Sequence, residues 1–382
     1  MKKLVSIVIF LILALASVDA QELITLGAPG KEGELIYPRE IRVGPDGNIY
    51  VYDEVDAFIK VYSPQGQYLR KMGGEGQGPG EIQRRDGVSF GFMPEGKLFF
   101  TEYFRGHPWI TLLELTGKLV RVLKLELTES FGVPDAVSLP EGGFIAEFHF
   151  SGEQEKQKDY YLYKSPIKLF LLDSEAKFVS EIKKTNHYTR ISYRPDGADS
   201  GLPFTPRFNW CLYKNKTVLF ADGLSNHIEV YDFSGNLLKE ILAQIPEPEK
   251  VKAKDLDNWR EERKQATLGR NPGWYHQFGS VIEKYTSSIY KTKPMIGGLA
   301  LTPDGNIFVS GVWDSEKGTS EYWLLDESGK VLAQMNSAVA NITISKSYIF
   351  FVTADEEMNV KVRCLKRRAN EKEDILKLSR NF

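Results

Sequence analysis

The chain has 382 residues, with 49 Lys and Arg against 51 Asp and Glu and a formal net charge of −2. A chain so close to charge balance lacks the basic excess that attracts phosphate backbones, so its composition argues against a nucleic-acid partner. The two cysteines, Cys211 and Cys364, fall in different repeats, and we expect free thiols because a disulfide needs closely spaced Cα atoms.

The first 20 residues have the form of a secretory signal peptide. Lys2 and Lys3 precede an apolar run over residues 4–16, and the small residues Val18 and Ala20 follow it. The run has about 13 residues, fewer than the roughly 20 of a membrane-spanning helix. We therefore expect cleavage after residue 20 and a periplasmic or secreted protein without stable membrane insertion, with an uncleaved anchor as the alternative.

Residues 37–81 form the first internal repeat, which predicts four short strands. The first two strands flank the turn Gly44-Pro45-Asp46-Gly47, and the last two flank Ser63-Pro64-Gln65-Gly66. Alternating apolar and polar residues between Gly, Pro and Asp turns predict antiparallel hairpins rather than helices. The expected strands are residues 40–43, 49–52, 58–62 and 68–72.

The repeat recurs along the chain and implies a closed array. The later copies cover residues 90–117, 144–174, 218–235, 303–329 and 342–365. The last copy lacks a fourth strand, whereas residues 23–30 resemble residues 71–81, the end of the first repeat. We therefore expect the N-terminal strand to complete the last repeat, because closure removes the free sheet edges of an open array.

The first repeat resembles the NHL family. The resemblance lies in the Pro-x-x-Ile opening at Pro38, the run Asp46-Gly47-Asn48-Ile49-Tyr50-Val51 before Asp53, and the glycine-rich end over residues 73–80. It implies an all-β, six-bladed β-propeller with four antiparallel strands per blade, over residues 21–365, of the type found in exported bacterial proteins. It implies no particular ligand, since binders, lactonases, lyases and scaffolds share this architecture.

The longest connections are expected at one end of the propeller, which is therefore the predicted functional face. They include a helical insertion between the fourth and fifth blades, residues 243–296, with helices expected over 247–267 and 273–290. The insertion could be a lid over the channel or a strap over apolar surface. The charged tail, residues 366–382, predicts a surface helix or disorder. The other long connections are residues 53–57, 102–108, 149–161, 183–208 and 313–321.

Acidic residues and histidines on this face suggest one possible site. Asp53, Glu102 and Asp222 follow the second strand of their repeats, where a carboxylate can hold a cation or cap a turn. His107 and His149 are expected in the long connections, as is His276, and imidazole is a common metal ligand and general base. The alternative function is therefore a metal-assisted hydrolase or lyase using calcium or zinc, although no local metal-binding spacing supports it.

Arginines and aromatic residues on the same face suggest the preferred site. Guanidinium groups beside flat rings suit carboxylate or sugar recognition. We therefore expect a monomeric binding or scaffold protein that needs no cofactor and recognises a carbohydrate, peptide or protein partner. The candidate ligand-binding residues are Arg190, Arg194, Arg207, Trp210, Trp274, Tyr275 and Trp313.

Overall fold

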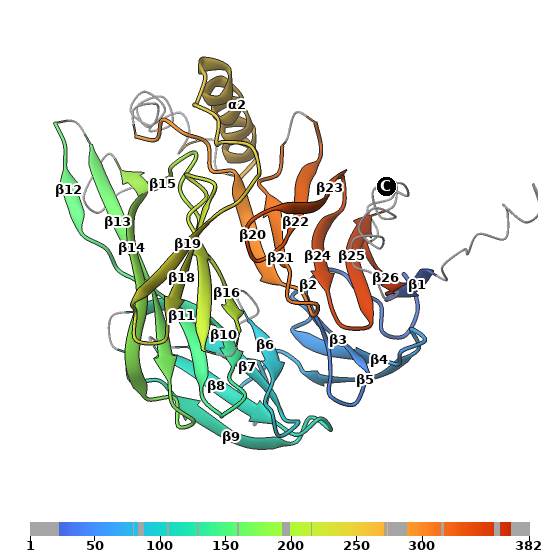
Figure 1. Cartoon of the computed structure of the whole chain (residues 1–382). Coiled ribbons are helices and arrows are strands. Elements are labelled where there is room, and N and C mark those ends of the chain that lie inside the picture. The colour runs from blue at the N-terminus through green and yellow to red at the C-terminus, as the bar shows by residue number, and fades with distance from the viewer. Residues whose placement is uncertain are drawn as a thin grey trace, which may run out of the picture.

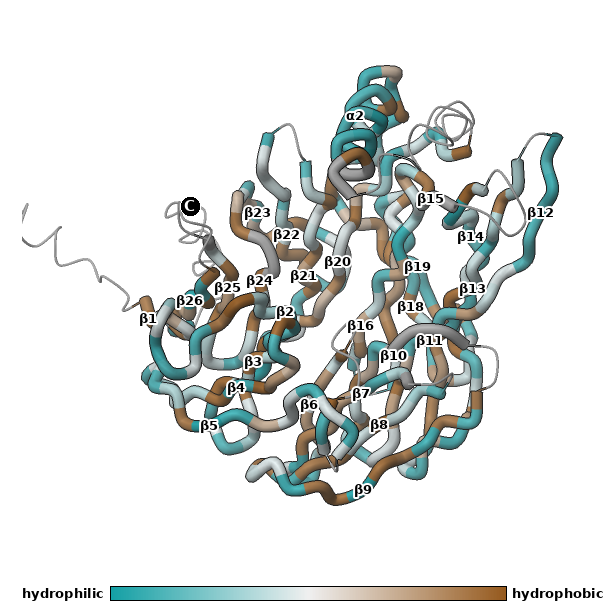
Figure 2. The backbone as a smooth tube through the Cα atoms, turned by 180° about the vertical axis from the view of Figure 1, so that it is seen from behind, coloured by the Kyte–Doolittle hydropathy of each residue, from teal (hydrophilic) through white to brown (hydrophobic). Residues whose placement is uncertain are grey.

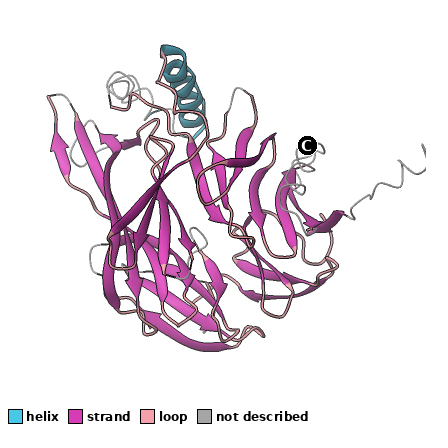
Figure 3. Cartoon of the chain, viewed as in Figure 1, coloured by secondary structure: helices cyan, strands magenta, loops and turns pink. Residues whose placement is uncertain are grey.

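A computed structural model describes residues 23–78, 80–82, 88–104, 107–127, 130–158, 160–192, 199–214, 216–270, 273, 289–314, 317–354 and 360–367. This part of the chain is almost entirely β-structure and includes one long helix, α2 (Ala253–Arg270) (Figures 1 and 3). The strands form six antiparallel sheets. The predicted signal peptide, residues 1–20, lies outside the described residues.

The first, second and third sheets follow one another in sequence. The first contains β2 (Pro38–Val43), β3 (Ile49–Asp53), β4 (Phe58–Tyr62) and β5 (Tyr68–Gly73). The second contains β6 (Phe90–Phe92), β7 (Leu98–Phe104), β8 (His107–Leu113) and β9 (Leu119–Lys124). The third contains β10 (Ser130–Ser138), β11 (Phe144–Phe150), β13 (Tyr161–Leu172) and β14 (Phe178–Ser192), with β12 (Gln154–Lys156) on β13 and β15 (Asp199–Gly201) on β14.

The remaining sheets each have four strands. The fourth contains β16 (Asn209–Tyr213), β17 (Thr217–Ala221), β18 (His227–Asp232) and β19 (Leu237–Leu242). The fifth contains β20 (Ile296–Leu301), β21 (Ile307–Gly311), β22 (Ser320–Leu325) and β23 (Val331–Ser337). The sixth contains β24 (Ala340–Ile344), β25 (Tyr348–Ala354), β26 (Val360–Lys366) and, from the other end of the chain, β1 (Leu23–Leu26).

Glycine turns fix the hairpins in which these strands pair. Gly47 has a φ of 79° and Gly66 a φ of 84°, a left-handed conformation that glycine adopts without steric cost. The N–H of Gly47 donates to the carbonyl of Gly44 at 2.9 Å, which closes the turn. A Cβ on Gly66 would lie only 2.5 Å from the side chain of Ile24 in β1, so this turn also lets the sixth sheet approach the first.

Apolar clusters join each sheet to the next, and the sixth to the first. Alternating apolar residues along the strands (Figure 2) supply both faces of each sheet. In the last cluster, Leu26, Val362 and Cys364 of the sixth sheet pack with Ile49 and Val51 of the first. Consecutive antiparallel sheets packed in this way have the arrangement of a β-propeller.

The pairing of β1 with β26 confirms the predicted role of the N-terminal strand. Leu23 lies opposite Leu365 and Leu26 opposite Val362, and the guanidinium of Arg363 donates to the Thr25 hydroxyl at 2.8 Å. Cys211 and Cys364 are free thiols, as expected. Burial raises the pKa of the Cys211 thiol to about 12 and that of Cys364 further still, so both stay protonated.

The predicted loop over residues 183–208 is wrong in its first half. β14 continues to Ser192 and stays paired with β13, so that Arg190 lies opposite Tyr163. The extended hairpin persists because Leu162 and Ile191 bury their side chains with Leu202 in a small cluster of their own. The connections expected at 102–108 and 149–161 are also shorter than predicted, since β7 reaches Phe104, β8 begins at His107 and β12 occupies 154–156.

The segment between β19 and β20 contains the first expected helix as α2. Its base is a short antiparallel pair in which Lys293 N–H donates to the Glu249 carbonyl at 2.8 Å. The Asp255 carboxylate accepts from Lys252 N–H at 2.7 Å at the helix start and from the Lys293 ammonium at 3.2 Å. The second expected helix, 273–290, and the tail, 368–382, lie almost wholly outside the described residues. No helix in the described part is apolar and long enough to cross a bilayer.

Shortening a buried side chain of β1 is expected to destabilise the whole protein. Leu26 is fully buried where the sixth sheet packs on the first, so Leu26→Ala should lower the free energy of unfolding by about 2 to 5 kcal/mol. Leu23→Ala in the same strand is the control, because Leu23 is 39% exposed. Urea unfolding followed by tryptophan fluorescence measures both variants, and equal effects would contradict this account of β1.

Candidate functional site

Polar residues occupy one equivalent position on the first strands of the first three sheets. Glu40 of β2 lies opposite Tyr52, and Asp135 of β10 lies opposite Glu147. Ser89 precedes β6, and its carbonyl accepts from Thr101 N–H at 2.8 Å in the matching place of the second sheet. The antiparallel register therefore brings two carboxylates and a hydroxyl to the same level of neighbouring sheets.

Hydrogen bonds between sheets show that these first strands lie side by side. The Ser89 hydroxyl donates to the Asp135 carboxylate at 2.9 Å. The Phe90 N–H donates to the Glu40 carboxylate at 2.8 Å. Trp210 of β16 donates its indole N–H to the Glu147 carboxylate, also at 2.8 Å. The first strands β2, β6 and β10, together with β11 and Trp210 of β16, thus share one polar site, which we call the first-strand site.

The first-strand site surrounds a hollow of about 420 Å³. Its wall comes from the first three sheets, at the end where β2 begins and β11 finishes. This is the end that the sequence predicted to be functional. Beside the hollow, Trp210 reaches in from the fourth sheet through its bond to Glu147. The lining residues are Arg39, Glu40, Val88, Ser89, Asp135, Glu147 and His149.

Glu147 connects most of the polar groups in this site. One oxygen of its carboxylate contacts Nε2 of His149 at 2.8 Å and the other accepts from Trp210. Asp135 is its direct cross-strand partner, beside a bulge that interrupts β10 between Phe131 and Asp135. Two carboxylates opposite each other in a sheet cost stability, and bulges are common next to functional sites.

Glu40 is held in a setting that disfavours its charged form. Burial raises the pKa of the Glu40 carboxyl above its usual range, and the negative charge of Asp135 raises it further. The paired Arg42 guanidinium and the Phe90 N–H oppose this shift without cancelling it. The neighbouring Arg39 is tied to Glu54 and lies 4.5 Å from the ring centre of Tyr37.

Two of the sequence-predicted residues belong to the first-strand site. His149 was expected in a long connection, but it lies within β11, because β11 continues to Phe150. Trp210 was expected near a group of arginines, and the structure brings it to Glu147 instead. Neither prediction included Glu40, Ser89, Asp135 or Glu147.

Asp53 serves as a turn cap in this structure. Its carboxylate accepts from Ile36 N–H at 2.7 Å and Tyr37 N–H at 2.8 Å, and it pairs with the Lys60 ammonium at 2.8 Å. The side chain is fully buried. These contacts correspond to the capping alternative for this position, with an added buried ion pair.

The other acidic and histidine candidates lie apart from one another. Glu102 is buried in β7, 3.4 Å from the Thr111 hydroxyl, and His107 begins β8 rather than lying in a loop. Asp222 follows β17 and caps Leu224 N–H at 2.9 Å. Within the described residues, no group of three or more His, Cys, Asp or Glu is arranged to hold a metal ion. His276 lies outside them.

The remaining ligand-binding candidates are spread over several sheets. Arg190 belongs to β14, not to a loop, and its guanidinium lies 5.2 Å from the ring centre of Tyr163. Arg207 precedes β16, and its N–H donates to the Asp222 carbonyl at 3.0 Å. Trp313 follows β21 and is 46% exposed. Arg194, Trp274 and Tyr275 lie outside the described residues.

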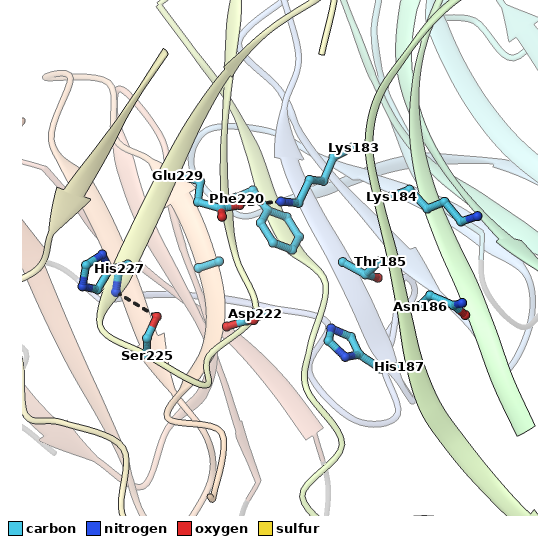
Figure 4. Close-up of a pocket in the computed structure, with 11 residues that line it drawn as sticks. Lys183, Lys184, Thr185, Asn186, His187, Phe220, Asp222, Ser225, His227 and Glu229 are labelled. Carbon is cyan, nitrogen blue, oxygen red and sulfur yellow. Dashed lines mark hydrogen bonds and ion pairs between the residues drawn. The ribbon is translucent and has the colours of Figure 1, made fainter. Parts of the chain in front are cut away.

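A second cleft of about 320 Å³ lies between β14 of the third sheet and β17 and β18 of the fourth (Figure 4). Lys183 donates to Glu229 at 2.6 Å and to the Tyr231 hydroxyl at 2.5 Å, and these bonds raise its pKa despite the opposing effect of burial. His187, which the sequence prediction omitted, faces this cleft, and burial lowers the pKa of its imidazole. The lining residues are 183–187, 220–222, Ser225, His227 and Glu229.

Comparison with known proteins leaves the family unassigned. No family model matches the chain, and no curated protein matches it significantly. Among solved structures, a Bacteroides fragilis protein described as exported is 14% identical, with a TM-score of 0.49, covering 92% of this chain and 98% of its own. The virginiamycin B lyase of Staphylococcus aureus is 11% identical, with a TM-score of 0.42, covering 90% of this chain and 99% of its own.

A third solved structure is the calcium-binding protein regucalcin of Agrobacterium tumefaciens. It is 10% identical, with a TM-score of 0.43, and the match covers 88% of this chain and 92% of regucalcin. At these identities and scores, none of the three transfers an activity or a ligand to this chain. The fold description therefore depends on the sheets and their packing alone.

Removing the Glu40 carboxyl is expected to change how stability depends on pH. Because its pKa is raised in the folded state, the wild type should lose stability as pH rises from the usual carboxyl range through that raised value. Glu40→Gln has no carboxyl to ionise at this position and so does not lose this stability. The melting temperature of Glu40→Gln minus that of the wild type should therefore be larger at pH 7 than at pH 4. Thermal melts across this range measure it, with the exposed Glu141→Gln as control. Parallel profiles for Glu40→Gln and wild type would contradict the raised pKa.

Proposed function

We propose that the chain is an exported, six-bladed β-propeller of the NHL-like type that binds a hydroxyl-rich ligand, such as a carbohydrate, at the first-strand site. The signal-like leader and the repeat pattern support the export and the family resemblance. Six sheets and an apolar cluster shared by the sixth and first sheets support a closed ring. The carboxylates that converge on one hollow are the observation that carries the binding proposal.

The chemistry of the hollow specifies what its ligand must offer. Ionised carboxylates only accept hydrogen bonds. Asp135 and Glu147 have no Lys or Arg within ion-pair distance among the described residues, although His149 contacts Glu147. Glu40, in contrast, is paired with Arg42. A ligand that fills the hollow must therefore supply several donors, as sugar hydroxyls or an amino sugar do.

The shape of the site also suits a ligand of this kind. Its volume of about 420 Å³ falls within the range of roughly 300 to 1,000 Å³ that is typical of small-molecule pockets. Trp210 is fixed at its edge by the bond to Glu147 and is partly exposed. An aromatic ring beside carboxylates is a common arrangement for packing on a sugar ring while its hydroxyls are hydrogen-bonded.

Binding to a glycan array followed by calorimetry with the selected sugars tests this function. Asp135→Asn and Glu147→Gln should each weaken binding roughly tenfold to a hundredfold, because each removes a charged acceptor. Glu141→Gln, on an exposed turn of the same sheet, should leave affinity unchanged. If no sugar binds, or if binding tolerates both carboxylate variants, the proposed function is wrong.

The enzymatic alternative rests on the contact between His149 and Glu147. An imidazole held by a carboxylate at 2.8 Å is an arrangement that general bases use. Metal assistance would require an ion that the described residues do not gather ligands for. Elemental analysis of purified protein tests the metal: stoichiometric calcium or zinc would favour metal assistance, and its absence would exclude the metal-assisted form of this alternative.

A further inference from the structure

We propose that the free edge of β14, over residues 183–187, is a second binding site, which takes a short extended peptide as an added strand. The site is the cleft between the third and fourth sheets (Figure 4), and it shares no lining residue with the hollow of the first-strand site. Five consecutive residues of one strand line this cleft. Since successive side chains of a strand point to opposite faces, a hollow lined by all five reaches the edge of the strand as well as one of its faces.

The register of the third sheet determines which backbone groups point into this edge. Paired residues of antiparallel strands alternate between exchanging two hydrogen bonds and exchanging none. Pro166 lies opposite Asn186 and has no N–H to donate, so this pair is of the kind that exchanges none. The N–H and C=O of Asn186 therefore point away from β13, toward the free edge.

Two contacts show that the pair formed by Lys164 and Tyr188 also exchanges no hydrogen bonds. Lys164 lies opposite Tyr188, and its N–H donates to the Glu153 carbonyl at 3.0 Å, on the side away from β14. The Tyr188 carbonyl accepts from the Tyr290 hydroxyl at 2.7 Å, on the side away from β13. By the same alternation, Lys184 directs its N–H and C=O toward the free edge. No described residue hydrogen-bonds the backbone of Lys184 or Asn186 on that side.

The length of this edge selects a peptide rather than a second folded sheet. At one end β15 occupies the edge from Arg190 to Ser192. At the other, Gly235 lies so close that a Cβ on it would be 2.7 Å from the Glu181 carbonyl. Because the open stretch is short and flanked by β17 and β18, a short extended chain can enter where the edge of another propeller cannot.

The side chains add a preference for an acidic residue in the peptide. Lys184 and Asn186 project to the face opposite Lys183 and His187 (Figure 4), and both are exposed. Lys183 is already neutralised by Glu229, whereas Lys184 has no acidic partner among the described residues. An acidic side chain directly across from Lys184 would form an opposite-charge cross-strand pair. The proposed partner is therefore a peptide segment with an acidic residue flanked by residues that tolerate extended structure.

The register also supplies a selective test. Asn186→Pro removes the edge N–H and places the proline ring in the path of the peptide, but it removes no bond to β13, because proline is tolerated where an edge strand faces outward. Asn186→Ala keeps the backbone donor and is the matched control. Lys184→Glu tests the charge preference. Melting temperatures near that of wild type would show that all three variants fold.

The probe is a phage-displayed library of random heptapeptides, with selected sequences synthesised and measured by fluorescence polarisation. We expect peptides that bind wild type and Asn186→Ala alike, bind Asn186→Pro about tenfold more weakly, and lose affinity on Lys184→Glu. Their binding should slow hydrogen exchange at the Lys184 and Asn186 amides. Equal binding to Asn186→Pro, equal loss with Asn186→Ala, or a wild-type dimer that Asn186→Pro dissolves would each overturn the proposal.

Discussion

The pairing of β1 with β26 is the constraint on which the rest of the structure depends. Leu23 to Leu26, from the start of the described chain, complete a sheet whose other strands come from its end. The completed sheet presents Leu26, Val362 and Cys364 to the first sheet, so the first and last parts of the described chain are joined by strand pairing and apolar packing. β2 then has packed neighbours on both sides, and its Glu40 is held at a fixed place beside Ser89 and Asp135. A loosened first sheet would separate these groups.

The first-strand site is built at some cost to the fold. Asp135 and Glu147 are opposite each other in one sheet, and Glu40 has a pKa raised by burial and by Asp135. The equivalent position of the fourth sheet is Asn209. Its side-chain amide donates to the carbonyls of Ala221 and Ile296, at 3.2 and 3.1 Å. A protein selected only for stability would have no reason to concentrate three carboxylates, Glu40, Asp135 and Glu147, around one hollow. Such local departures from the most stable choice are typical of functional positions.

Much of the architecture could be predicted from the sequence, because turns and alternation are local signals. The Gly47 and Gly66 turns and the unpaired last repeat were enough to predict the hairpins and the partner of β1. The site residues were harder to predict, because Glu40, Asp135 and Glu147 look like ordinary polar positions of alternating strands. Their convergence depends on register and on the neighbouring sheet, and a comparison of equivalent first-strand positions would have revealed it. The long connection predicted at 183–208 was wrong in its first half, because β14 continues to Ser192 and Ile191 and Leu202 pack the extended hairpin.

The two candidate sites use the same repeat in different ways, and their chemistry separates them. The first-strand site offers side-chain carboxylates around its hollow, so we expect a ligand there to be recognised through charge and hydrogen-bond acceptance. The β14 edge offers backbone N–H and C=O groups, because the third sheet is extended beyond its neighbours and β15 covers only part of the added edge. Contacts to carboxylates depend on pH and salt, whereas main-chain hydrogen bonds depend on neither to the same degree. The two proposed sites share no lining residue, so occupation of one does not by itself exclude occupation of the other.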